Sequence, residues 1–185
     1  ILQDDSDLRI TQCDNARYQV AHKRNYIIKN VGDKVNGPFE DFAPVTTADD
    51  NVLFFTSRRV RKDSVNNKLF SPQDGKHFED VYVSYRNRTT GLWDEPEVLG
   101  TVSNPKSNQA TISVTVDGSR LFVYVDDEGD GNIYTSDYDG QEYGRLQKLD
   151  DNINTSDWET HATVSLDGST IYFVSDKEGG FGGRD

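Results

Sequence analysis

Residues 109–124 read Gln-Ala-Thr-Ile-Ser-Val-Thr-Val-Asp-Gly-Ser-Arg-Leu-Phe-Val-Tyr, and residues 161–174 repeat the pattern as His-Ala-Thr-Val-Ser-Leu-Asp-Gly-Ser-Thr-Ile-Tyr-Phe-Val. A looser copy occupies residues 42–55, with Asp49-Asp50 at its centre. In each copy a short alternating strand precedes the central pair and an aromatic-rich strand follows it, which predicts a β-hairpin. A type I′ turn needs positive φ at both central residues, so we expect that turn at Asp117-Gly118 and Asp167-Gly168.

The three copies belong to a repeat of about 50 residues. Asp117 and Asp167 are 50 positions apart (167 − 117), whereas Asp49 and Asp117 are 68 apart (117 − 49). The first unit therefore contains an insertion, which we place in the polar stretch 58–77. A Gly-rich turn follows the later hairpins, at 129–132 and 179–183. We predict third strands at 80–85 and 132–136, and weaker fourth strands that end near Leu99 and Leu149.

Four short antiparallel strands per repeat predict an all-β fold, a β-propeller of four-stranded blades. We place the blades at about 25–100, 101–150 and 151–185, the last of them truncated. Propellers typically have about four to eight blades, so we expect the propeller to be incomplete in this chain. Residues 1–24 are expected to form a short helical segment capped by Asp7 and running to about His22, the tail of a preceding helical domain. Residues 25–29 are expected to form a strand that leads into the first blade.

Composition narrows the classes of function. The chain has 32 Asp and Glu against 20 Lys and Arg, a formal charge of -12, which argues against binding to nucleic acid or an anionic membrane surface. No apolar run approaches the roughly 20 residues of a membrane-spanning helix, so no transmembrane segment is expected. The single cysteine, Cys13, excludes an internal disulfide and a cysteine metal cluster.

A calcium site is the one cofactor site that the residues suggest. Oxygen ligands occur at alternate positions around Gly131, as at positions one, three, five and seven of an EF-type loop: Asp126, Glu128, Asp130 and Asn132. The flanking segments are predicted strands and not helices, and the alternative is a solvated turn between two strands. Calcium is therefore a possible cofactor, and no other is expected.

Two further groups of residues are candidates for partner binding. The first would line a polar rim where blades begin: Glu40, Asp41, Gln109, Glu159 and His161. Capping of strand ends is the alternative role for that group. The second is a basic run at the start of the insertion, a candidate docking loop for an acidic surface: Arg58, Arg59, Arg61 and Lys62. A solvated loop is the alternative there.

The sequence contains no catalytic signature, so we do not expect an enzyme. It has no Gly-x-Ser-x-Gly elbow and no P-loop, and its three histidines have no metal-ligand spacing: His22, His77 and His161. The alternative is a fragment of a hydrolase, because some hydrolases also carry propellers.

The repeats resemble the TolB-type, WD-like β-propeller repeat, in which a strand, a "PDG"-like turn and an apolar strand lead to "SDR". The matching stretches are residues 165–176, Ser-Leu-Asp-Gly-Ser-Thr-Ile-Tyr-Phe-Val-Ser-Asp, and residues 48–59. Val116 stands where that family has Pro, and Asp50 where it has Gly. The order of segments is similar to that of envelope proteins of Bacteroidetes-type bacteria that join a TPR segment, this propeller and an OmpA-like domain.

The resemblance implies a non-catalytic scaffold in the bacterial periplasm or at the outer membrane, which binds envelope protein partners. It also implies an association with type IX secretion or gliding, and with peptidoglycan through an OmpA-like domain absent from these residues. A calcium- or glycan-binding propeller module is the alternative function.

Overall fold

The computed structural model describes residues 2–127 and 129–185, in two compact units, Ile1–Asn30 and Val31–Asp185. The first unit contains helix α1, Leu2–Ala21. The helix starts before Asp7, so the prediction that Asp7 caps it is wrong: the backbone oxygen of Asp7 accepts a hydrogen bond from Thr11 Oγ1 within the helix. Within the described residues, no helix has both the length and the apolar character that a bilayer crossing requires.

The strand expected at residues 25–29 is also absent. None of these residues pairs with a described strand, and the side chains of Tyr26, Ile27 and Ile28 are exposed. A β-strand needs a neighbouring strand for its backbone hydrogen bonds, and the apolar run alone does not supply one.

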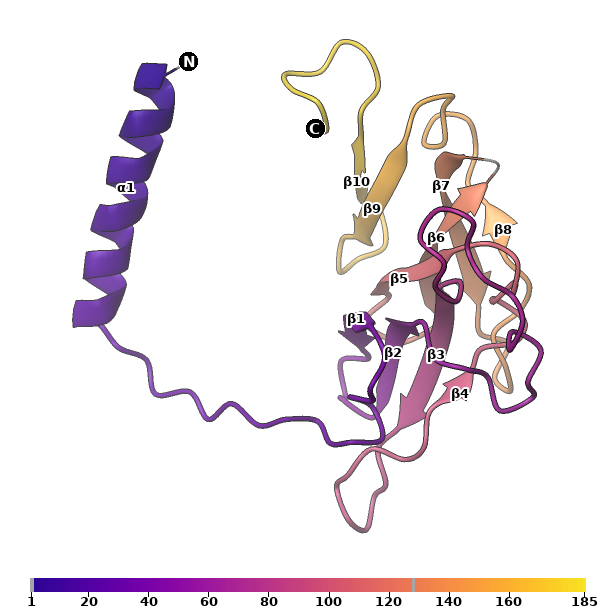
Figure 1. Ribbon diagram of the computed structural model, residues 1–185. Helices are drawn as coiled ribbons and strands as arrows, with labels where there is room; N and C mark the ends of the chain where they lie inside the picture. Colours follow the sequence, from indigo (N-terminus) through magenta and orange to yellow (C-terminus); the bar gives the residue numbers. More distant parts are fainter. Residues whose placement is uncertain (1, 128) are drawn as a thin grey trace. The chain divides into compact units, whose positions relative to one another are not determined.

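The second unit is built from antiparallel strands in three sheets (Figure 1). The first sheet has the order β1-β2-β3-β4 and consists of Asp41–Thr46, Val52–Ser57, Asp80–Tyr85 and Glu97–Val98. The second has the order β5-β6-β7-β8 and consists of Gln109–Val114, Arg120–Asp127, Asp130–Asp137 and Gln147–Lys148. The third pairs β9, Glu159–Val164, with β10, Ile171–Ser175. The predicted strand order is confirmed for the first two sheets, and the insertion forms a loop.

The first strand of each later sheet packs on the sheet before it: β5 contacts β1, β2 and β3, and β9 contacts β5, β6 and β7. Alternate side chains of a strand point to opposite faces, which divides the core into layers. Phe54 of β2 packs between the first and second sheets with Val81, Leu121 and Val123. Its neighbour Phe55 packs on the other face of the first sheet, with Val35, Leu53, Tyr82 and Trp93. The layer between the second and third sheets contains Phe122, Ile133 and Ala162.

The three hairpin turns share one hydrogen-bonding pattern. In the second sheet, Thr115 Oγ1 donates to Asp117 Oδ1 and accepts from the amide of Arg120, and the amide of Ser119 donates to the same Asp117 oxygen. Thr47 with Asp49 and Ser165 with Asp167 form equivalent bonds. In each turn, the hydroxyl residue two positions before the aspartate thus also accepts from the amide five positions further along the chain.

The predicted type I′ turn is therefore wrong. Positive φ occurs only at the residue after each aspartate: Asp50 at 57°, Gly118 at 73° and Gly168 at 72°. A left-handed conformation is strained for a residue with a Cβ atom.

Replacing Gly168 by alanine should lower the free energy of unfolding by about 1 kcal/mol, because the added Cβ meets no atom within 4 Å and only the backbone conformation resists it. Gly118→Ala should cost more, since its Cβ would approach Thr47 Cγ2 to 3.0 Å. Urea unfolding of the two variants measures the difference. Equal losses in both would contradict the contact with Thr47.

Each linker between two sheets is hydrogen-bonded to the sheet that precedes it. Ser103 Oγ accepts a hydrogen bond from the amide of Val81 at 2.9 Å and donates to the carbonyl oxygen of Val81. Asn154 does the same for Ile133, with Oδ1 accepting at 2.7 Å and Nδ2 donating at 2.8 Å. Val81 lies in β3 and Ile133 in β7, so the third strand of the first and of the second sheet is completed by a side chain of the following linker.

Candidate functional site

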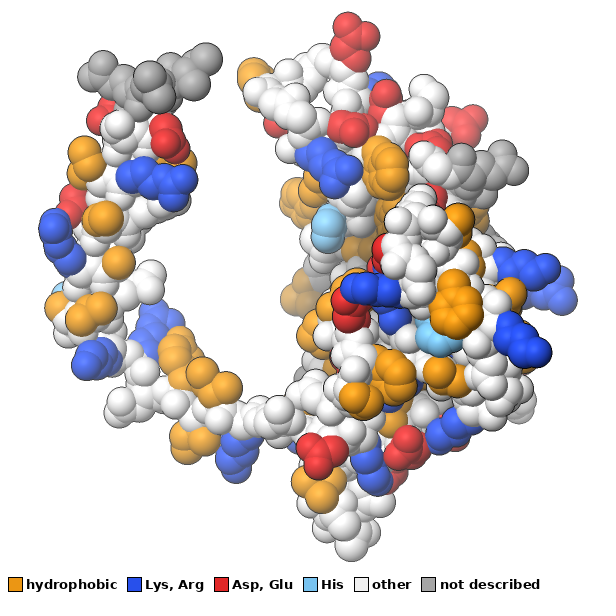
Figure 2. All heavy atoms as spheres, in the orientation of Figure 1, with side chains coloured by type: hydrophobic (Ala, Val, Ile, Leu, Met, Phe, Trp, Pro, Cys, Tyr) orange, Lys and Arg blue, Asp and Glu red, His pale blue; other side chains and the backbone are white. Residues whose placement is uncertain are grey.

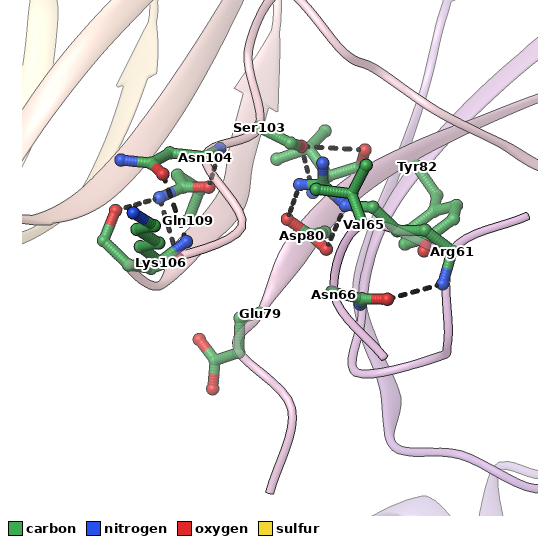
Figure 3. A network of polar contacts seen from close by, with 12 residues as sticks. Arg61, Val65, Asn66, Glu79, Asp80, Tyr82, Ser103, Asn104, Lys106 and Gln109 are labelled. Atoms are coloured by element: carbon green, nitrogen blue, oxygen red, sulfur yellow. Dashed lines mark hydrogen bonds and ion pairs between the residues drawn. The ribbon is translucent and has the colours of Figure 1, made fainter. Parts of the chain in front are cut away.

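The insertion, residues 58–77 of the loop between β2 and β3, is anchored by a buried ion pair (Figure 3). Arg61 lies 19 residues before Asp80, and its Nε donates to Asp80 Oδ2 at 2.8 Å while Nη2 donates to Oδ1. The side chain of Asp80 is 0% exposed and that of Arg61 5%. Burial raises the pKa of the Asp80 carboxyl, and the hydrogen bond and charge of Arg61 oppose that shift. The backbone amide of Arg61 in turn donates to Asn66 Oδ1, which closes the loop.

The side chains of the other arginines of the predicted docking loop are also largely buried. Arg58 bonds Glu79 Oε1 at 2.7 Å, and Arg59 bonds Asp41 Oδ1 at 2.7 Å. Their side chains are 14% and 11% exposed, against 67% for Lys62. The run was expected to project as a basic patch, but the acidic groups at the strand ends take up three of its four charges. Partner binding by Lys62 stays a prediction.

The predicted rim residues divide into two groups. Three are largely buried and cap the segment leading into their strand: Asp41 Oδ2 accepts from the amide of Gly37, Gln109 Oε1 from Asn104, and Glu159 Oε2 from Thr155. For these the described contacts show the strand-capping role that the sequence left as an alternative. Glu40 is exposed and pairs with Lys76 and Arg58, and His161 is exposed and contacts Thr160 Oγ1.

The predicted calcium ligands lie on the β6–β7 hairpin. Asp126 pairs with Gly131 across the hairpin, so its side chain points to the face opposite that of Asp130 and Asn132. Glu128 lies outside the described residues. Among residues 2–127 and 129–185, no group of three or more His, Cys, Asp or Glu side chains is arranged to hold a metal ion. The three ligands that the structure describes therefore do not converge on one point, and calcium binding stays a prediction.

Asn132 and Asp80 occupy equivalent places in successive sheets, because each directly precedes the strand residue that the linker binds, Ile133 or Val81. Asp80 is paired with Arg61 of the insertion. Asn132 is 1% exposed, and its Oδ1 has no hydrogen-bond partner among the described residues. The insertion thus supplies a charge partner to the first sheet, while the second sheet carries a neutral amide at that position. In the sequence, the signal for the Arg61–Asp80 ion pair is the alignment of Asp80 with Asn132, since a carboxylate stands where the second repeat has a neutral amide.

The turn aspartates make the fold sensitive to acid. Hydrogen bonds from the amide of Ser119 and the hydroxyls of Thr115 and Ser119 lower the pKa of Asp117 to about 2. The hydroxyl and amide groups of Ser165 and Ser169 likewise lower the pKa of Asp167 to about 2. A carboxyl whose folded pKa lies below its unfolded value of about 3.8 stabilises the fold above that pH.

Stability should therefore fall as the pH decreases from about 4 to about 2, and Asp167→Asn should flatten the dependence in that window. Carboxyl carbon NMR titration and thermal unfolding between pH 2 and pH 5 test both expectations. A titration of Asp117 at an ordinary aspartate pKa would contradict the role of the turn hydrogen bonds.

Six of the thirteen predicted site residues make contacts that hold strands, linkers or the insertion in place: Asp41, Arg58, Arg59, Arg61, Gln109 and Glu159. The exposed remainder includes Glu40, Lys62 and His161. Neither a scan against protein-family models nor a search of the curated proteins finds a match for this chain.

Proposed function

We propose that this protein is a non-catalytic scaffold whose sheets are blades of a β-propeller and whose exposed loops bind protein partners. The observation that carries the proposal is the repetition of detail from sheet to sheet. The first hairpin of each sheet uses the same hydroxyl–aspartate turn, and the two linkers complete the preceding sheet through equivalent side chains. The first strand of each later sheet also packs on the sheet before it, which is expected of blades that each contact only their neighbours.

The insertion loop is the part best suited to hold a partner. Its ion pairs fix the loop, so that binding would cost little ordering entropy. The loop nevertheless exposes apolar side chains, with Val60 42%, Val65 52% and Phe70 52% exposed. Figure 2 shows hydrophobic side chains on the surface of the second unit among charged side chains of both signs. Apolar groups rimmed by charge are typical of protein-binding surfaces.

The cellular setting follows from the resemblance alone: the periplasm or outer membrane of a bacterium, in association with the secretion or gliding machinery. In this proposal the partners are envelope proteins, and peptidoglycan would be reached through a further domain.

Co-purification of the native protein from the cell envelope, followed by mass spectrometry, tests the proposal. The expected result is a native polypeptide with further repeats and a bound envelope protein. The matched variants are Phe70→Ser in the insertion and Leu92→Ser, which removes an exposed apolar side chain from another loop (67% exposed). Loss of the partner with Phe70→Ser alone supports docking by the insertion. A native protein that purifies without a bound partner would overturn the scaffold role.

A further inference from the structure

A cavity of about 380 Å³ lies between the hairpin turns of the first and second sheets. Three tyrosines form its aromatic wall: Tyr85 is 52% exposed, Tyr138 is 43% exposed and Tyr143 is buried. The rings of Tyr138 and Tyr143 lie 5.0 Å apart, and the hydroxyl of Tyr143 donates to the carbonyl oxygen of Gly118 at 2.5 Å. The buried tyrosine thus fixes the turn, and the two exposed rings face solvent.

The cavity is negatively charged. Asp49 and Asp117 line it, and hydrogen bonds within their turns lower the pKa of both carboxyls, so both are ionised at neutral pH. Among the described residues that line the cavity, none is Lys or Arg. Asp117 Oδ1 takes the bonds from Thr115 and Ser119, and no described contact occupies Oδ2. One carboxylate oxygen of a residue that lines the cavity with the tyrosines is therefore available to a ligand.

The same combination of rings and carboxylate holds arginine elsewhere in this chain. The guanidinium carbon of Arg59 lies 5.0 Å from the ring centroid of Phe55, and Arg59 bonds Asp41. Arg86 lies 4.7 Å from the ring centroid of Trp93 and bonds Asp50 at 2.6 Å. A guanidinium group is planar, stacks on aromatic faces and donates to carboxylates, which suits both sites.

We propose that the cavity between the Asp49 and Asp117 turns binds an arginine side chain of a protein partner. The guanidinium group would stack on the exposed rings of Tyr85 and Tyr138 and donate a hydrogen bond to Asp117 Oδ2. The inference rests on the proposed scaffold function only for the source of the arginine. The cavity itself is formed by the first two sheets.

The test uses the full chain labelled with ¹⁵N and titrated with N-acetyl-arginine amide, followed by NMR. Saturable shifts are expected at the amides of Val116 and Gly118. N-acetyl-citrulline amide has the same shape without the charge and should bind at least about tenfold more weakly, since charged hydrogen bonds are the stronger ones.

Two variants at equivalent turns locate the effect. Asp117→Asn keeps one side-chain oxygen for Thr115 and Ser119 and replaces the available oxygen by an amide. Asp167→Asn makes the same change in the third sheet, at a residue that does not line this cavity. Affinity should fall about tenfold in Asp117→Asn and stay unchanged in Asp167→Asn, and Tyr138→Leu should also weaken binding.

The proposal is overturned by three results: no saturable shifts with the arginine probe, equal binding of the citrulline probe, or equal affinity of the Asp117→Asn and Asp167→Asn variants. Binding of the free probe without any co-purified partner would leave this site intact and count against the scaffold function. The two proposals therefore fail separately.

Discussion

Replacing Asp80 by alanine should lower the free energy of unfolding by about 3–5 kcal/mol, because it leaves the Arg61 guanidinium buried without its counter-charge. The loss should be larger than for any single exposed ion pair. Arg61 also joins the insertion to β3, so the same change should expose residues 58–77 to limited proteolysis. Urea unfolding and protease sensitivity of the full chain measure the two effects.

The matched control is Asp137→Ala, which removes the partner of Arg120. That pair is also made through two guanidinium nitrogens, but its side chains are 50% and 48% exposed, so a change of about 1 kcal/mol or less is expected. A double variant, Arg61→Met with Asp80→Asn, should recover much of the loss, because Asn132 occupies the equivalent place without a cation. Equal losses for Asp80→Ala and Asp137→Ala would refute the importance of burial.

Phe54→Ala should cost about 3–5 kcal/mol, through loss of buried apolar surface and the cavity that remains. Phe54 is 0% exposed, and its ring meets that of Tyr143 edge-on at 5.2 Å between the first and second sheets. Trp93 lies in the other core layer of the first sheet, so its fluorescence reports the unfolding.

Phe173→Ala is the control with the same chemistry, since Phe173 is 37% exposed on β10, and about 1 kcal/mol or less is expected there. Loss of the edge-on contact should also move the buried Tyr143 ring, which aromatic NMR signals would detect. A Phe54→Ala protein as stable as Phe173→Ala would contradict the assignment of the core to the space between the sheets.

The order of the strands could be predicted from the sequence because their signals are local. Alternation around Asp117 and Asp167, together with the following apolar runs, specifies hairpins whatever the surroundings. The turn type was predicted wrongly because the deciding bond comes from the side chain of Thr115 or Ser165, two residues outside the pair that defines a type I′ turn.

The candidate site was harder to predict because its contacts are long-range. From the sequence, a run such as Arg58–Arg59 is typical of a solvated loop. Its acidic partners, Glu79 and Asp41, are distant along the chain and lie beside it only in the folded protein. The aromatic cavity likewise joins Tyr85 to Tyr138 from different repeats. Hydrophobic periodicity carries no information about which side chains of two stacked sheets meet.

The side chains of Ser103 and Asn154 give the chain a direction of assembly. The backbone amide of Val81 finds its acceptor only when residue 103 has been synthesised, and the amide of Ile133 only when residue 154 has. During synthesis, the hydrogen bonds of the first sheet are therefore completed only after the linker that follows it has been made. The second sheet likewise waits for its own linker. The segment that contains both a sheet and the side chain that completes it runs from the start of that sheet through the linker after it, and is offset from the repeat seen in the sequence.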